Sequence, residues 1–133
     1  MLLTRECDYA MRIVRALADG MKRHVASICH EEHMPVQYVY KIMKKLETAG
    51  LVRAVRGREG GYVLERPIDE LTPYDVVIAV GEQTLITECL RADADCPRNT
   101  AANPCVMHKE FGRVQDVLTA ELQRWTFQEL MRE

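Results

Sequence analysis

The sequence lacks the features that mark a secreted, membrane-spanning or catalytic protein. It opens without the basic segment and short apolar core of a secretory signal, and no apolar run approaches the roughly 20 residues that span a bilayer. It also has no Cys-x-x-Cys pair, no Gly-rich cofactor loop and no nucleophile paired with a base. These absences argue against a membrane protein and against a thiol oxidoreductase, so we expect a cytoplasmic protein that is not an enzyme.

Charge is unevenly distributed along the chain. The 133 residues are 47% hydrophobic, enough for one domain with its own core, and the formal net charge is only -2. Residues 1–66 nevertheless hold 12 Lys and Arg against 8 Asp and Glu, whereas residues 67–133 hold 6 against 12. A basic half and an acidic half suit a protein with one part facing DNA and another facing away.

The basic half centres on residues 35–64, where a helical pattern is followed by a Gly-rich hairpin. Val39, Ile42, Met43 and Leu46 form one apolar stripe of a helix that ends at residues 49–50, and its opposite face is polar and basic. Apolar strands at 51–55 and 62–64 flank a turn at 56–61. This order predicts a winged helix-turn-helix that binds double-stranded promoter DNA; the alternative is an ordinary solvated charged face. The expected DNA contacts are Gln37, Tyr38, Tyr40, Lys41, Lys44, Lys45, Arg56, Gly57, Arg58, Gly60, Gly61 and Tyr62.

Three further helices are expected around this unit. Thr4 is a plausible N-cap for a first helix that buries Ala10, Ile13, Val14 and Leu17 and stops near Gly20. A short second helix is expected at about 28–33, with Pro35 opening the next one. Thr72 and Pro73 predict a fourth helix that packs through Tyr74, Val77 and Ile78, with Val76 and Val80 as further candidates, and ends at Gly81.

Five cysteines in a reducing compartment favour metal or redox chemistry over disulfides. Cys29 is expected in the core, whereas Cys89, Cys96, Cys105 and His108 fall in a stretch without hydrophobic periodicity. Gaps of six and eight residues are wide for structural zinc and suit an iron-sulfur cluster better, and three unrelated free thiols are the remaining alternative. Asp8, taken alone, is most simply a solvated acid at a helix N-terminus.

The last part of the chain predicts a dimer helix. Met107, Phe111, Val114, Leu118, Leu122 and Trp125 form a near-heptad apolar seam. Pairing with the seam of a second copy is favoured over packing within the monomer, because a DNA reader of this type usually needs two half-sites. Thr126 and Glu129 form a capping box for a final short helix, which we expect to contact the partner subunit.

Several of these segments carry a resemblance to a known family. They are Leu3-Thr4 with Asp8-Tyr9, Lys41-Ile42 with Leu46, Ala49-Gly50-Leu51-Val52, Ala54-Val55-Arg56-Gly57 with Gly60-Gly61-Tyr62, the three-cysteine loop, and the closing Trp125-Thr126-Phe127-Gln128-Glu129-Leu130. Together they resemble, nearly end to end, the Rrf2 family of winged-helix transcription regulators. Within it the chain looks closest to the nitric-oxide-sensing NsrR and iron-responsive RirA branches.

The resemblance implies a homodimeric transcription regulator that acts as a repressor. Its cluster would be held by Cys89, Cys96 and Cys105. It implies Asp8 of the partner subunit as fourth ligand and a 4Fe-4S cluster; His108 matches the alternative ligand of the iron-sulfur branch, with 2Fe-2S. Three departures from the family pattern are a long gap from Cys96 to Cys105, a second helix that begins about two residues short, and His33 in place of a turn glycine. Tyr40 also stands where the iron-sulfur branch has a glutamate, so the target sequence does not transfer.

The expected fold is therefore mainly α with a small β-wing. A winged helix-turn-helix domain at 1–81 would be followed by a cysteine-rich loop at 82–108 and by a dimerisation helix with a short C-terminal helix at 106–133.

Overall fold

The computed structural model describes residues 3–81 and 84–132, so the predicted boundaries at residues 1, 82 and 133 lie outside the described residues. In chain order the elements are α1 (Arg5–Ala16), α2 (Val25–Glu32), α3 (Val36–Thr48), β1 (Val52–Val55), β2 (Gly61–Leu64), α4 (Pro73–Val80), the short 3-10 helix η1 (Glu88–Leu90), α5 (Val106–Arg124) and α6 (Phe127–Leu130). The two strands are antiparallel, with Val52 opposite Leu64 and Val55 opposite Gly61. The predicted fold class, mainly α with a small wing, is confirmed.

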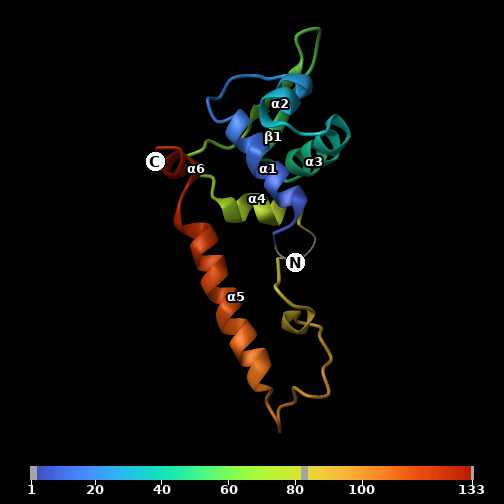
Figure 1. Ribbon diagram of the computed structural model, residues 1–133, viewed down its shortest axis with the longest axis vertical. Helices are drawn as coiled ribbons and strands as arrows, with labels where there is room; N and C mark the ends of the chain where they lie inside the picture. Colours follow the sequence, from blue (N-terminus) through green and yellow to red (C-terminus); the bar gives the residue numbers. More distant parts are fainter. Residues whose placement is uncertain (1–2, 82–83, 133) are drawn as a thin grey trace.

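The molecule is elongated (Figure 1). Helices α1 to α4 and the hairpin form one body, and the tip of the hairpin projects from its far end. Helix α5 runs away from this body, and the segment that contains η1 lies beside its N-terminal half, at the end opposite the hairpin. The tip of the predicted wing and the cysteine loop therefore lie at opposite ends of the elongated molecule.

The core lies where α1, α3 and α4 meet. The stripe predicted for α1, made of Ala10, Ile13, Val14 and Leu17, is completely buried, and so is the stripe predicted for α3. Each fully buried Val, Leu or Ile side chain stabilises the fold by about 1.5–3 kcal/mol. The core thus confirms the helical periodicity read from the sequence.

Helix α4 packs through a face different from the main prediction. Val76, Val77 and Val80 are buried, whereas Tyr74 is half-buried and Ile78 is 47% exposed. The helix is apolar on most of its surface, so periodicity alone could not select the face that meets α1 and α3.

Side-chain caps begin three helices, as predicted. Thr4 Oγ1 accepts from the Cys7 amide at 3.3 Å. At α4, the Thr72 hydroxyl accepts from the Asp75 amide, and an Asp75 carboxylate oxygen accepts from the Thr72 amide at 2.8 Å. The same reciprocal arrangement joins Thr126 and Glu129 at α6.

The predicted bounds of the second helix, 28–33, were wrong at the start. Helix α2 begins at Val25, which is buried, and its N-cap His24 makes no side-chain capping bond that would have marked the start in the sequence. It ends because His33 adopts a left-handed conformation with φ of 53°. Pro35 is the N-cap of α3 rather than its first helical residue, and the turn between the two helices is therefore 33–35.

The C-terminal seam is divided between two environments. Leu118 and Leu122 pack against the core of their own chain, whereas Met107 and Val114 are 55% and 38% exposed. Helix α6 also packs on its own chain: Phe127 is buried, its amide donates to the Leu71 carbonyl at 2.8 Å, and the Gln128 amide donates to the Ile68 carbonyl at 3.0 Å. Phe127 thus packs within its own chain, whereas Leu130 of the same helix and Met131 after it are exposed, so contact of this helix with a partner subunit stays a prediction. Among the described helices, none has the length and apolar character needed to cross a membrane.

Candidate nucleic-acid interface and cysteine loop

The face of α3 that points away from the core carries the predicted base-reading residues. Gln37, Tyr38, Tyr40, Lys41 and Lys44 are all exposed. The Tyr38 ring meets the Tyr9 ring of α1 edge-on, with centroids 6.1 Å apart, which restricts its rotamers. This face can therefore present amide, phenol and ammonium groups to the edges of base pairs in a major groove.

Lys45 differs from Lys44 because its ammonium is already bound within the chain. Nζ lies 2.6 Å from a carboxylate oxygen of Glu6 and donates to the Val80 carbonyl at 3.1 Å. Lys41 pairs with the other oxygen of Glu6 at 2.9 Å. Hydrogen bonds from Lys45 and then Lys41 lower the pKa of Glu6 below its usual value. Lys45 therefore joins α3 to α1 and α4 and is less available to DNA than Lys44.

The wing carries two arginines at its tip. Arg56 and Arg58 are exposed, and within residues 3–81 and 84–132 neither has an ion-pair or hydrogen-bond partner through its side chain. Gly57 has φ of 115°, a conformation that side chains other than hydrogen rarely adopt. A Cβ at Gly60 would lie 2.7 Å from the Val55 carbonyl oxygen. The two glycines thus close the turn and leave the guanidinium groups free for phosphate.

The base of the wing is joined to the turn between α1 and α2. The Arg23 amide donates to the Tyr62 carbonyl at 3.0 Å, and the Tyr62 amide donates back at 2.9 Å. Burial raises the pKa of the Tyr62 phenol. Gly61 and Tyr62, which the sequence suggested as DNA contacts, are half-buried and also support the hairpin through their backbones; their contact with DNA stays a prediction.

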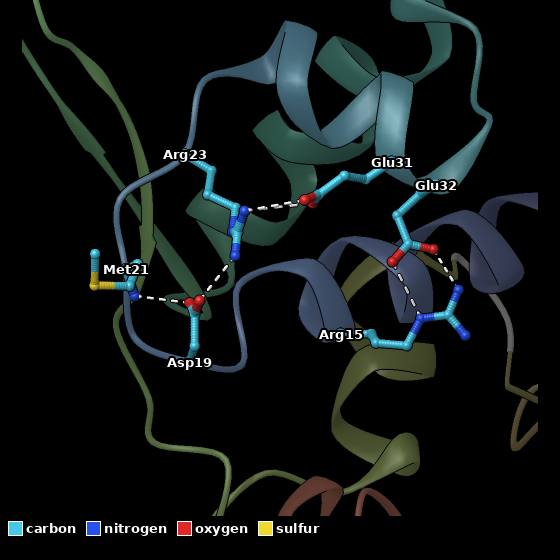
Figure 2. Close-up of polar contacts among 6 residues, drawn as sticks. All are labelled: Arg15, Asp19, Met21, Arg23, Glu31 and Glu32. Atoms are coloured by element: carbon cyan, nitrogen blue, oxygen red, sulfur yellow. Dashed lines mark hydrogen bonds and ion pairs between the residues drawn. The ribbon is translucent and has the colours of Figure 1, made fainter.

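Ion pairs surround this junction (Figure 2). Arg23 binds Asp19 and Glu31, and Arg15 of α1 binds Glu32 at the end of α2. The sequence analysis missed this cluster. Only the pair Asp19 and Arg23, four residues apart, carried a local signal, because the other contacts depend on how α1 and α2 pack.

The three loop cysteines are half-buried thiols at the opposite end of the molecule. Cys89 and Cys96 line one hollow of about 380 Å³, together with Glu88, Asp93 and Asp95. Cys105 is the N-cap of α5. Its amide donates to Asn99 Oδ1 at 2.9 Å, and the Asn99 amide donates to the Cys96 carbonyl at 2.9 Å. Asn99 therefore links the backbones around the second and third cysteines.

His108 lies in the first turn of α5 and has an unusual environment. Its Nδ1 atom is buried and has no hydrogen-bond partner among the described residues. A buried nitrogen without a partner is costly, and ligation would satisfy it. In the described part of one chain, however, no three side chains of His, Cys, Asp or Glu lie close enough together to hold a metal ion. The donor types fit a cluster, but one chain in this conformation does not assemble them.

Asp8 is on the exposed side of α1, and both its oxygens contact Arg12, at 3.2 and 3.0 Å. It lines a hollow of about 560 Å³ between α1 and α6, whereas Cys89 and Cys96 line a different one. The predicted metal ligands are therefore not brought together within one chain.

Gln115 on α5 forms hydrogen bonds with the start of the cysteine loop. Gln115 Oε1 accepts from the Ile86 amide at 2.8 Å, and its Nε2 donates to the Thr84 carbonyl at 3.1 Å and to Thr119 Oγ1 at 3.2 Å. The segment that leads into Cys89 is thus held against the middle of α5.

Comparison with known proteins agrees with this architecture. The family model described as Rrf2, iron-dependent transcriptional regulator, matches residues 3–133. The chain belongs to the Rrf2 family. It is therefore a winged-helix transcription regulator rather than an enzyme, as predicted, although the NsrR or RirA branch stays a prediction.

Two relatives and one solved structure illustrate the match. Protein aau3 of Rhizobium meliloti is 31% identical over 99% of this chain and 86% of its own length. The regulator IscR of Vibrio atlanticus is 30% identical over 100% of this Rrf2 chain and 76% of its own. The structure of CymR, the global cysteine regulator of B. subtilis, superposes with a TM-score of 0.76 at 21% identity, covering 96% of this chain and 94% of that one. At that identity, the last similarity shows the fold alone.

Proposed function

We propose that this Rrf2 protein is a cytoplasmic, homodimeric repressor that binds promoter DNA and senses nitric oxide, redox or iron status through a cysteine-ligated iron-sulfur cluster. The observation that carries the DNA-binding part is the shared placement of two basic surfaces. Lys44 on α3 and Arg56 and Arg58 on the wing are exposed, and no partner within the described residues neutralises them. Helix α3 and the hairpin belong to the same body of the molecule (Figure 1).

In such a complex, α3 would lie in the major groove and the wing would reach the adjacent backbone. Lys44 and the two wing arginines would contact phosphate, while Gln37 and the tyrosines of α3 would face base edges. Binding two half-sites requires two recognition helices at a fixed spacing. The exposed seam residues Met107 and Val114 on α5 support pairing with a second copy.

Cys89, Cys96 and Cys105 would hold the cluster, and its irons would supply a centre that reacts with nitric oxide or oxygen. The chain offers two candidates for the fourth ligand. Asp8 of the partner subunit is the one implied by the family resemblance, with a 4Fe-4S cluster. His108 is supported by its buried, unpartnered Nδ1, and it lies on the chain that carries the three cysteines.

The residues around the cysteines suggest how a change in the loop would reach DNA. Gln115 holds the loop to α5, and α5 in turn packs on α4, whose residues contact α1 and α3. A loop released from Gln115 would change the position of α5, and with it the spacing of the two recognition helices. The result would be a shift between binding-competent and incompetent dimers.

A second candidate function keeps the winged helix but replaces the cluster. Cys89 and Cys96 line the same hollow, which favours zinc held by Cys89, Cys96, Cys105 and His108, or a disulfide formed on oxidation.

The deciding experiment is anaerobic purification followed by a visible spectrum, analysis of iron, sulfide and zinc, and titration with nitric oxide. A brown protein with about four irons per subunit that nitric oxide bleaches supports the 4Fe-4S sensor. About two irons per subunit would instead indicate a 2Fe-2S centre. A colourless protein with one zinc, or with no metal, would move the sensing chemistry to zinc or thiols.

Paired variants identify the fourth ligand. Asp8→Ala and His108→Ala are compared with Asp69→Ala and His30→Ala, which remove exposed residues of the same types far from the cysteine loop. The variant that loses iron, or changes the spectrum, while its control does not, identifies the ligand. Equal iron content and the same spectrum in all four would exclude both candidates.

A further inference from the structure

The wing needs support from outside the hairpin. Strands β1 and β2 have four residues each and form a sheet of only two strands. Hairpins of this size are marginally stable in water on their own. Their position relative to α3 therefore depends on the contacts at their base.

Arg23 makes the main-chain contact at that base. Its backbone pairs with Tyr62 through two hydrogen bonds of 3.0 and 2.9 Å, which extend the hairpin by a single bridge. At the neighbouring Gly61, a Cβ would lie 2.5 Å from the Arg23 carbonyl oxygen. The two backbones therefore approach so closely that only glycine fits, which fixes the register of the bridge.

The side chain of the same residue holds the two helices that flank it. Arg23 Nη2 lies 2.8 Å from Asp19 Oδ2, beyond the end of α1, and Nη1 lies 3.2 Å from Glu31 Oε1, on α2 (Figure 2). Asp19 is itself oriented, because its other oxygen accepts from the Met21 amide at 2.9 Å, and this bond lowers the pKa of its carboxyl group. The Arg23 side chain is 29% exposed and its Nε atom is buried. The guanidinium is thus enclosed between two carboxylates rather than extended toward DNA.

One residue therefore connects three parts of the DNA-binding unit. Its backbone pairs with the wing. Its guanidinium binds Asp19, beyond the end of α1, and Glu31 on α2, and α2 in turn packs against α3. We infer that Arg23 is a positioning residue for DNA binding, which sets the wing relative to α3 so that Arg56 and Arg58 meet the backbone beside the groove that α3 occupies. This inference rests on the proposed DNA-binding function and adds a residue that does not itself touch DNA.

The test is a double-mutant cycle measured by fluorescence anisotropy. The full-length protein binds a labelled duplex that it has selected from a random-sequence library. Arg23→Ala and Arg58→Ala are each expected to weaken binding about tenfold. If Arg23 acts through the wing, the double variant stays near tenfold rather than approaching a hundredfold. In a parallel cycle of Arg23→Ala with Lys44→Ala on α3, the losses of affinity of the two single variants should multiply in the double variant.

Glu31→Gln separates positioning from simple charge. Removing an acid near DNA raises affinity if only electrostatic attraction matters. If Arg23 needs Glu31 to hold its place, affinity falls instead, by several-fold. Asp69→Asn removes an exposed acid that has no side-chain partner among the described residues, so it provides the control for charge alone. Glu31→Gln also keeps the test informative if Arg23→Ala does not fold.

Two results would overturn the inference. One is unchanged affinity in Arg23→Ala, and the other is affinity losses for Arg23 and Arg58 that multiply, since these would mean independent roles. Failure of the proposed function looks different: the unmodified protein would then select no duplex at all, or Arg58→Ala and Lys44→Ala would have no effect.

Discussion

Phe127 should be the residue through which the C-terminal helix contributes most to stability. It is 6% exposed, belongs to the core of the winged-helix body, and is the first residue of α6. Truncating a buried phenylalanine removes its transfer free energy and leaves a cavity, which together cost about 3–5 kcal/mol. Because the site lies at the edge of the core, where α6 can partly collapse, we expect a value near ~3 kcal/mol for Phe127→Ala.

The matched control is Leu130→Ala on the same helix. Leu130 is 42% exposed, so its truncation should cost less than about 1 kcal/mol. Both free energies of unfolding come from urea titrations at one fixed protein concentration, because subunit association would otherwise change the apparent stability. In thermal melts, Phe127→Ala should lower Tm by roughly 10 °C. Equal costs for the two variants would refute the conclusion that α6 docks on its own chain through Phe127.

Three other predictions address charge, DNA contact and the turn. Because ion pairing depresses the pKa of Glu6 below its usual 4.5, its contribution to stability is present above about pH 4.5 and is lost as pH falls through the folded-state value; Glu6→Gln should remove this part of the acid dependence in pH-dependent urea titrations. Arg56→Ala should weaken DNA binding and reduce the slope of log affinity against log salt by roughly 0.9, whereas Lys109→Ala on α5 should not; an unchanged slope for Arg56→Ala would contradict a phosphate contact. His33→Gly should stabilise the protein by about 1 kcal/mol, because His33 has a left-handed backbone; His30→Gly inside α2 should destabilise it by a similar amount in the same titrations.

Much of the site was predictable because its signals are local. The exposed face of α3 follows from apolar residues three and four positions apart, and the wing follows from glycines beside arginines. The three loop thiols and His108 are likewise a local signal, because all four fall within residues 89–108. Whether those four side chains hold a cluster, and with which fourth ligand, remains a prediction.

The structure changed the interpretation of residues whose contacts are distant in sequence. Lys45 had the same pattern as Lys44, yet its ammonium binds Glu6, which is 39 residues away. Gly61 and Tyr62, predicted DNA contacts, have a further role that the sequence did not show, because their backbones support the hairpin against Arg23. No periodicity encodes such pairs, because they arise only when α1, α3 and the wing pack together.

The sequence by itself determined most of the helices, the three side-chain caps at Thr4, Thr72 and Thr126, and the order of the winged helix, since each depends on residues within one or two turns of the chain. Only the tertiary structure decided which side chains are buried, exposed or ion-paired. It placed Phe127 in the core of its own chain, left part of the α5 seam exposed, buried the Nδ1 atom of His108 and enclosed Arg23 between two carboxylates. The physical reason is that burial and ion pairing depend on distances between elements, which local propensity does not specify.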